Sequence, residues 1–159
     1  MSSRSLVRLG LCAAVAVSWS VVPLSRAESE AKKFKTEYFK GKVVPLAKAV
    51  EKFGVQLDAD AGWLVLLGDD GKIYPLIKDD GSRMFFKDTR LLNRPMRLTG
   101  RLLPGSQLLQ VVEIHSYNQK NELQEVYYWC DICTIKRYEK KLCDCCGAPM
   151  ELREVPVRK

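Results

Sequence analysis

The sequence Trp63-Leu-Val-Leu-Leu-Gly-Asp-Asp-Gly-Lys-Ile-Tyr-Pro-Leu-Ile77 contains two apolar runs separated by Gly68-Asp-Asp-Gly71. Glycine accepts the positive φ of a tight turn between paired strands, so Asp-Gly between two such runs predicts a β-hairpin. Pro75 has no N–H group to donate to a neighbouring strand, so we expect the second strand to lie at a sheet edge or to contain a bulge. This hairpin indicates a fold that is mainly β.

The segments on both sides of the hairpin add further elements. The range 38–44 predicts a short strand, after which Pro45 opens a helix of one to three turns. Apolar residues then recur at the helical spacing as far as Phe53, and Gly54 is placed to end the helix. We expect this helix to lie on the sheet. Further along, the range 84–86 resumes the apolar pattern, and the range 88–93 predicts a second short helix.

Two more strands are expected to pair across the turn Pro104-Gly105-Ser106. The first alternates Met96, Leu98 and Leu102 with Arg97, Thr99 and Arg101; the second has Val112 and Ile114 on one face and Glu113 and His115 on the other. We interpret the outward side as a solvated, partly ion-paired face that needs no ligand. His115, the single histidine, is interpreted in the same way, because no acid–base partner or nucleophile can be assigned to it.

This element order resembles that of small bacterial OB-fold domains in exported proteins. The resemblance extends over the range 38–117, within a β-domain that we assign to residues 38–121, and it implies a small, partly open β-barrel with one or two short helices, in the mainly β (α+β) class. It further implies binding of an oligonucleotide, oligosaccharide or peptide. The better helix precedes the second strand, which departs from the common OB order. No stacking platform of exposed aromatic side chains can be identified for a nucleic acid.

Residues 1–27 are typical of a cleavable signal peptide. Arg4 and Arg8 precede an apolar run over the range 9–22, and Ser25-Arg26-Ala27 provides small residues at the −3 and −1 positions. The run is shorter than the ~20 apolar residues needed to cross a bilayer, which favours cleavage over an anchor. Cys12 could instead be lipidated, but Leu11 before it is larger than the usual small residue. The expected location is periplasmic or secreted.

Cleavage also changes the charge of the protein. The full chain has a formal charge of +7, and removing the signal takes away three arginines and no acid, which leaves +4. Residues 28–37 then form a charged lead-in, and the rest is about one domain's worth of chain. An exported protein of this modest charge rarely meets nucleic acid, so we do not expect a nucleic-acid partner, nor a permanent membrane span.

Residues 122–159 form a cysteine-rich tail. Two C-x-x-C pairs, Cys130-Asp-Ile-Cys133 and Cys143-Asp-Cys-Cys146, are separated by nine residues. Two such turns facing each other supply the four sulfurs that a tetrahedral Zn²⁺ or Fe ion requires. Because cysteines of exported proteins are usually oxidised, two structural disulfides with one free thiol, or a redox-active pair, are the alternatives. The mature chain retains five cysteines, an odd number, and Cys145 is the spare one.

The second pair is followed by Gly147, and its C-x-x-C-G ending resembles the knuckles of zinc ribbons and rubredoxins. The first pair has Thr134 in the corresponding position. The resemblance implies Cys130, Cys133, Cys143 and Cys146 as ligands, with Cys145 pointing away or substituting for Cys143. The basic residues between the pairs suit a negatively charged zinc–thiolate centre as well as a solvated loop; they are Lys136, Arg137, Lys140 and Lys141.

The chain also resembles an uncharacterised family of small exported bacterial proteins. The residues that carry this resemblance are Gly41-Lys-Val-Val-Pro-Leu46, Tyr127-Tyr-Trp-Cys-Asp-Ile-Cys133 and Cys145-Cys-Gly-Ala-Pro-Met-Glu-Leu-Arg-Glu154. No Ser-His-Asp arrangement, paired carboxylate set, phosphate loop or haem motif is visible. The sequence therefore predicts a non-enzymatic binding or assembly protein with a structural zinc, whose partner is a protein, peptide or polysaccharide. The alternative is a redox protein that uses thiolate-bound iron or a dithiol.

Overall fold

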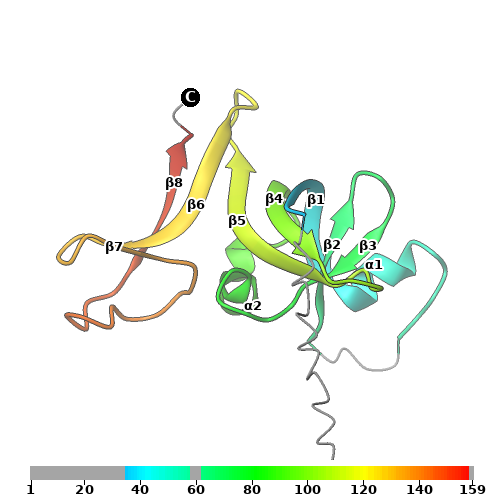
Figure 1. Cartoon of the computed structure of the whole chain (residues 1–159), viewed down its shortest axis with the longest axis horizontal. Helices are drawn as coiled ribbons and strands as arrows, with labels where there is room; N and C mark the ends of the chain where they lie inside the picture. Colours follow the sequence, from blue (N-terminus) through cyan, green and yellow to red (C-terminus); the bar gives the residue numbers. More distant parts are fainter. Residues whose placement is uncertain (1–34, 58–61, 158–159) are drawn as a thin grey trace, which may run out of the picture. The chain divides into compact units, whose positions relative to one another are not determined.

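The computed structural model describes residues 35–57 and 62–157. The predicted signal peptide and most of the charged lead-in lie outside these residues. In the described part of the chain the fold is mainly β: one sheet of eight strands accompanies two short α-helices and one 3-10 helix (Figure 1). Within these ranges no helix is long and apolar enough to cross a membrane.

The first five strands form the partly open β-barrel that was predicted. Their order in the sheet is β3-β2-β1-β4-β5, and every neighbouring pair is antiparallel. A parallel bridge between Leu76 and Leu109 brings the two ends of this sheet together, and the Ile77 N–H donates to the Leu109 carbonyl at 3.0 Å. The bounds are β1 Glu37–Pro45, β2 Leu64–Gly68, β3 Ile73–Pro75, β4 Pro95–Leu102 and β5 Leu109–Tyr117.

The predicted hairpin is confirmed as β2 and β3. Gly71 has a φ of 78° in the connecting turn, and Pro75 lies in the short strand β3 at the end of the path. Close packing of β1 on β2 depends on Gly41, because a Cβ atom there would lie 2.2 Å from the Leu67 carbonyl oxygen. The two strands can therefore approach this closely only because that side chain is absent.

The helix predicted after Pro45 is α1, Leu46–Glu51, and it lies against β1 and β2 with Ala49 fully buried. Gly54 has a φ of 74°, and its N–H donates to the Glu51 carbonyl at 3.0 Å, as expected for a glycine that ends a helix. Phe53 is 59% exposed, so its prediction as part of the buried face is wrong. The helix ends before Phe53, whose side chain consequently leaves the apolar stripe.

The segment between β3 and β4 contains one more helix than predicted. The apolar range 84–86 lies in α2, Arg83–Lys87, where Met84 and Phe85 are buried. The short helix expected over 88–93 is confirmed as the 3-10 helix η1, Thr89–Leu91. The Asp88 side chain accepts a hydrogen bond from the Arg90 backbone N–H at 3.1 Å and so caps this turn.

A β-bulge interrupts the pairing of β4 with β5. Thr99 is opposite Glu113 but Gly100 is opposite Val111, which leaves Val112 as the extra residue. Val112 is therefore 38% exposed, whereas Ile114 is fully buried. The prediction that these two side chains share a face is wrong, because a bulge shifts the alternation by one residue.

Strands β6, β7 and β8 continue the sheet into the tail, with bounds Leu123–Cys130, Ile135–Arg137 and Glu151–Pro156. The first residues of β6 pair with β5 and the last ones with β7, while β8 pairs along the other edge of β6. One apolar cluster extends from the barrel to Cys130, Cys143 and Met150. The Tyr128 hydroxyl also donates to the buried Asp88 carboxylate at 2.5 Å. The division of the chain at residue 121 stays a prediction.

Candidate metal centre

The two C-x-x-C pairs lie in two turns at the end of the sheet. Cys130 is the last residue of β6 and is fully buried; the turn after it leads into β7. The second pair lies in a turn closed by an antiparallel bridge between Leu142 and Pro149, just before β8. Because β7 and β8 both pair with β6, the two turns start from the same piece of sheet.

The two turns have matching backbone geometry. The Thr134 N–H donates to the Cys130 carbonyl at 2.8 Å, and the Gly147 N–H donates to the Cys143 carbonyl at 2.8 Å. Thr134 has a φ of 54° and Gly147 a φ of 72°, both in the left-handed region that residues with a branched side chain rarely adopt. Glycine follows only the second pair in the sequence, yet Thr134 adopts the same conformation after the first pair.

These turns bring four sulfur atoms together. The Sγ atoms of Cys130, Cys133, Cys143 and Cys146 all lie within 4.8 Å of one another. In a tetrahedral zinc site with Zn–S bonds of about 2.3 Å, the sulfurs are about 3.8 Å apart. The Cys130 and Cys146 sulfurs are 3.5 Å apart, and all the described cysteines are free thiols. The donor set and its spacing fit a tetrahedral thiophilic ion, so this group could bind a metal.

Backbone N–H groups and neighbouring thiols shift the pKa values of Cys130, Cys133 and Cys143 in different directions. Hydrogen bonds from the N–H groups of Cys146 and Cys145 lower the pKa of Cys143 to about 7. The thiols of Cys145 and Cys146, followed by burial, raise the pKa of Cys133. The N–H of Cys133 lowers the pKa of Cys130, but burial and the thiols of Cys143 and Cys146 outweigh it and raise that pKa. A bound divalent ion removes this competition, because it deprotonates the thiols that coordinate it.

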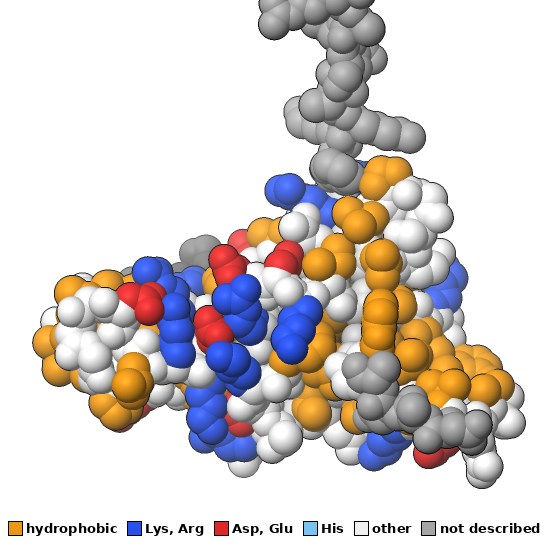
Figure 2. All heavy atoms as spheres, turned by 90° about the horizontal axis from the view of Figure 1, so that it is seen from below, with side chains coloured by type: hydrophobic (Ala, Val, Ile, Leu, Met, Phe, Trp, Pro, Cys, Tyr) orange, Lys and Arg blue, Asp and Glu red, His pale blue; other side chains and the backbone are white. Residues whose placement is uncertain are grey.

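The basic residues around the centre are mostly paired with carboxylates. Lys136 forms an ion pair with Glu125, and Asp144 pairs with Lys141 at 2.8 Å and with Arg137 at 3.6 Å. On the face shown in Figure 2, Lys and Arg side chains are interspersed with Asp and Glu side chains. Exposed pairs of this kind contribute little to stability. At Cys143 the largest causes of the lowered pKa are backbone N–H groups, those of Cys146 and Cys145.

Cys145 lies outside the group of four sulfurs. Its side chain is exposed, and its thiol is a neighbour of Cys133, whose pKa it raises. The sequence left two alternatives, in which Cys145 points away or replaces Cys143 as a ligand. In the structure Cys143 belongs to the group of four sulfurs and Cys145 does not. Among the described residues the four cysteines are the group found with metal-binding geometry, and it does not include His115.

His115 is placed differently from the prediction. It was interpreted as part of a solvated outer face, but it is only 6% exposed. Arg97, directly opposite it on β4, stacks its guanidinium on the Tyr38 ring at 4.8 Å, and no described ion pair joins Arg97 to Glu113. The prediction of a solvated, ion-paired face is therefore wrong at this point. Val155, Pro156 and Val157, which line the same cavity as His115, come from the far end of the chain, and no local pattern could indicate these surroundings.

Comparisons of the chain with protein-family models, with curated proteins and with solved structures found no match. The resemblance to a family of small exported proteins thus stays a prediction, and the argument about function depends on the residues of this chain.

Proposed function

We propose that this chain is an exported, non-enzymatic binding or assembly protein whose tail is stabilised by a structural zinc ion. The ligands would be Cys130, Cys133, Cys143 and Cys146. The observation that carries the proposal is the approach of these four sulfurs to within 4.8 Å of one another. When bound, the ion supplies no chemistry of its own to a substrate here, since all four positions of a tetrahedral site are taken by protein.

Two of the four cysteines are buried, which supports a structural role. Cys130 and Cys143 are 0% and 3% exposed and belong to the apolar cluster that also fills the barrel. An ion at this point connects β6 with the turns before β7 and β8, which are otherwise short elements with little core of their own. Metal binding in such a site contributes directly to folding, because the unfolded chain has no preformed site.

The export part of the proposal is supported by the basic residues, short apolar run and Ser25-Arg26-Ala27 of the first 27 residues. We expect the intact mass of the mature protein to correspond to an N-terminus at Glu28. A full-length product retained in the membrane would contradict export by cleavage.

The test of the metal site is elemental analysis of the purified protein, with one zinc ion expected per chain. Serine substitutions of Cys130, Cys133, Cys143 and Cys146 should each abolish stoichiometric metal, because a four-ligand site has no ligand to spare. Cys145→Ser is the matched control and should retain it. Equal retention by all five variants, or metal-free protein with two disulfides, would overturn the proposal.

The same sample distinguishes the second candidate, a redox protein. Iron bound by thiolates absorbs visible light, whereas zinc does not. One iron per chain with such absorption would assign the centre to electron transfer. A colourless protein with one zinc per chain would exclude that function for this site.

A further inference from the structure

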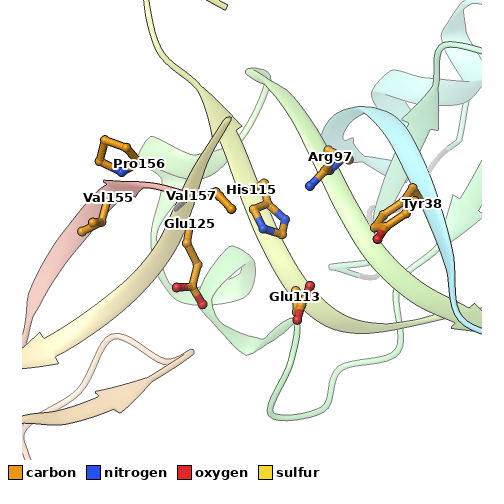
Figure 3. A pocket seen from close by; sticks show the side chains of 8 residues that line it. All are labelled: Tyr38, Arg97, Glu113, His115, Glu125, Val155, Pro156 and Val157. Carbon is orange, nitrogen blue, oxygen red and sulfur yellow. The ribbon is translucent and has the colours of Figure 1, made fainter. Parts of the chain in front are cut away.

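A polar cavity lies on the outer surface of the barrel, away from the cysteine centre. Its volume is ≈ 600 Å³, and it lies over the paired strands β4 and β5, where Arg97 is directly opposite His115. Figure 3 shows the His115 ring between Arg97 and Glu125, with Tyr38 beyond Arg97. The lining residues are Tyr38, Arg97, Glu113, His115, Glu125, Val155, Pro156 and Val157.

The C-terminal end of β8 provides the apolar side of this cavity. Val155 is paired with Glu125 in the sheet, and the Val157 N–H donates to the Leu123 carbonyl at 3.1 Å, which fixes the segment beside β6. Val155 and Val157 are 39% and 42% exposed, so they leave the cavity open to solvent. His115 at the base of the cavity is nevertheless buried, with 6% of its surface exposed.

The base of the cavity contains polar atoms without partners. The Arg97 Nε and His115 Nδ1 atoms, which belong to lining residues, are buried and have no hydrogen-bond partner, and the same holds for Thr99 Oγ1, two residues along β4 from Arg97. A buried polar group left unsatisfied costs about 1–3 kcal/mol, and native proteins contain few of them. Three such atoms lie on two neighbouring strands, and the fold alone does not explain why their energetic cost is retained. A retained cost of this kind is typical of a binding site.

The charges of the lining residues balance. Glu125 is already paired with Lys136, and Arg97 and Glu113 contribute one charge of each sign. Burial, followed by the Arg97 charge, lowers the pKa of His115, while Glu113 and Glu125 oppose this, and the net effect favours the neutral imidazole. The cavity thus offers hydrogen-bond donors and acceptors with almost no net charge.

This balance selects among ligand classes. A phosphate backbone or another polyanion would face two carboxylates, and a metal ion is disfavoured because these residues form no described metal-competent group. An uncharged molecule with many hydroxyl groups can donate to carboxylates and accept from the guanidinium at once. Tyr38 is 68% exposed and has Arg97 on one face, which leaves aromatic surface for the apolar face of a sugar ring.

We propose that this cavity binds an uncharged saccharide, with Glu113 and Arg97 hydrogen-bonded to its hydroxyl groups and Tyr38 against its ring. This inference rests on the binding role proposed above and names its ligand class. It places the ligand on the outer face of β1, β4 and β5, where Glu125 and the β8 terminus form the opposite wall.

The test uses the single histidine as a reporter. The chain has one histidine, so the imidazole resonances in a two-dimensional NMR spectrum come from His115 alone. The probes are tetrasaccharides of β-1,4-glucose, β-1,4-N-acetylglucosamine, α-1,4-glucose and β-1,4-mannose, each added up to about 10 mM, above the roughly 1 mM dissociation constant of a weak ligand. We expect at least one to shift these resonances saturably. An octathymidylate and glycylglycine are the anionic and zwitterionic probes and should cause no shift.

Two variants with matched controls complete the design. Glu113→Ala and Tyr38→Ala should each weaken saccharide binding at least tenfold, whereas Glu51→Ala and Phe53→Ala, exposed changes outside the cavity, should not. No shift with any saccharide, a shift with octathymidylate or glycylglycine instead, or equal affinities in all variants would overturn the proposal. Metal analysis of the same samples separates the two proposals, because a zinc-loaded, folded protein that fails to bind contradicts only the saccharide site.

Discussion

The hydrogen bond between Tyr128 and Asp88 joins the tail to the barrel, and Tyr128→Phe measures its contribution. Both residues are buried, at 1% and 3% exposure, and the phenol donates to the carboxylate at 2.5 Å. A hydrogen bond to a charged group contributes about 1.5–3 kcal/mol. Asp88 keeps Arg90 as a partner of the same oxygen, with the Arg90 Nη2 at 2.5 Å, so the carboxylate is not left unsatisfied.

We therefore expect Tyr128→Phe to lower the free energy of unfolding by about 2 kcal/mol at pH 7. For a protein of this size that corresponds to a decrease in Tm of roughly 6–10 °C. The measurement is thermal or urea unfolding of metal-loaded protein. Tyr127→Phe is the matched control: its ring contacts Trp129 and Lys136, and these contacts do not need the hydroxyl. We expect that control to stay within about 0.5 kcal/mol of the parent.

The difference in free energy of unfolding between the parent and Tyr128→Phe depends on pH, and this dependence provides a second measurement. Burial and then the Asp88 carboxylate raise the pKa of Tyr128 above its ordinary value of 10.0. A group whose pKa is raised by folding contributes stability below its unfolded pKa and loses it as the pH rises. The parent should thus lose about 1.4 kcal/mol of its advantage in free energy of unfolding over Tyr128→Phe between pH 9 and pH 11. Equal melting of the two phenylalanine variants, or a difference that is constant over this range, would refute the reasoning.

Three further predictions concern the backbone and the boundary of the tail. Thr134→Gly should raise the free energy of unfolding by about 1 kcal/mol and Gly147→Thr should lower it by about 1–3 kcal/mol, both in urea titrations, because both positions have a positive φ. If both substitutions changed the free energy of unfolding in the same direction and by the same amount, this reasoning would be contradicted. Gly41→Ala should lower the Tm or prevent folding, since its Cβ would meet a carbonyl oxygen at 2.2 Å; an unchanged melting curve would mean that the two strands can separate there without cost. The domain boundary placed after Asn121 from the sequence predicts that the truncated chain still melts cooperatively. The structure argues for the opposite outcome, because truncation removes β6 and the buried side chains that β6 contributes to the core. Calorimetry decides: a cooperative transition would support the boundary and contradict the argument from the core.

Local patterns were sufficient to predict the hairpin and most strands. The turn at Gly71 and the helix end at Gly54 both depend on residues within a few positions of each other, and the structure confirms both. The four cysteines were named from their spacing, which predicts the geometry of each turn, although only the sheet brings the two turns together. The equivalence of Thr134 with Gly147 was not predictable, because a branched residue rarely adopts a positive φ.

The remaining differences have a common physical cause, which is contact between distant segments. The bulge at Val112 depends on the pairing of β4 with β5 and leaves no mark in a regular alternation of side chains. The apolar range 84–86 was compatible with strand or helix, and packing in the barrel decided for α2. His115 was assigned to the surface because part of its surroundings, such as Val157 in the same cavity, follows it by about forty positions.

The cysteine centre and the saccharide cavity are connected by the same two strands. β6 contributes Glu125 to the cavity and ends at Cys130, and β8 contributes Val155 and begins five residues after Cys146. Among the described strands β8 pairs only with β6, and Arg94 and Ser116 of the barrel also hold its Glu154 side chain. A metal ion that joins the turn before β8 to the end of β6 fixes the two strands relative to each other at one end. Because these strands form one wall of the cavity, a structural ion would preorganise the binding site without contacting the ligand.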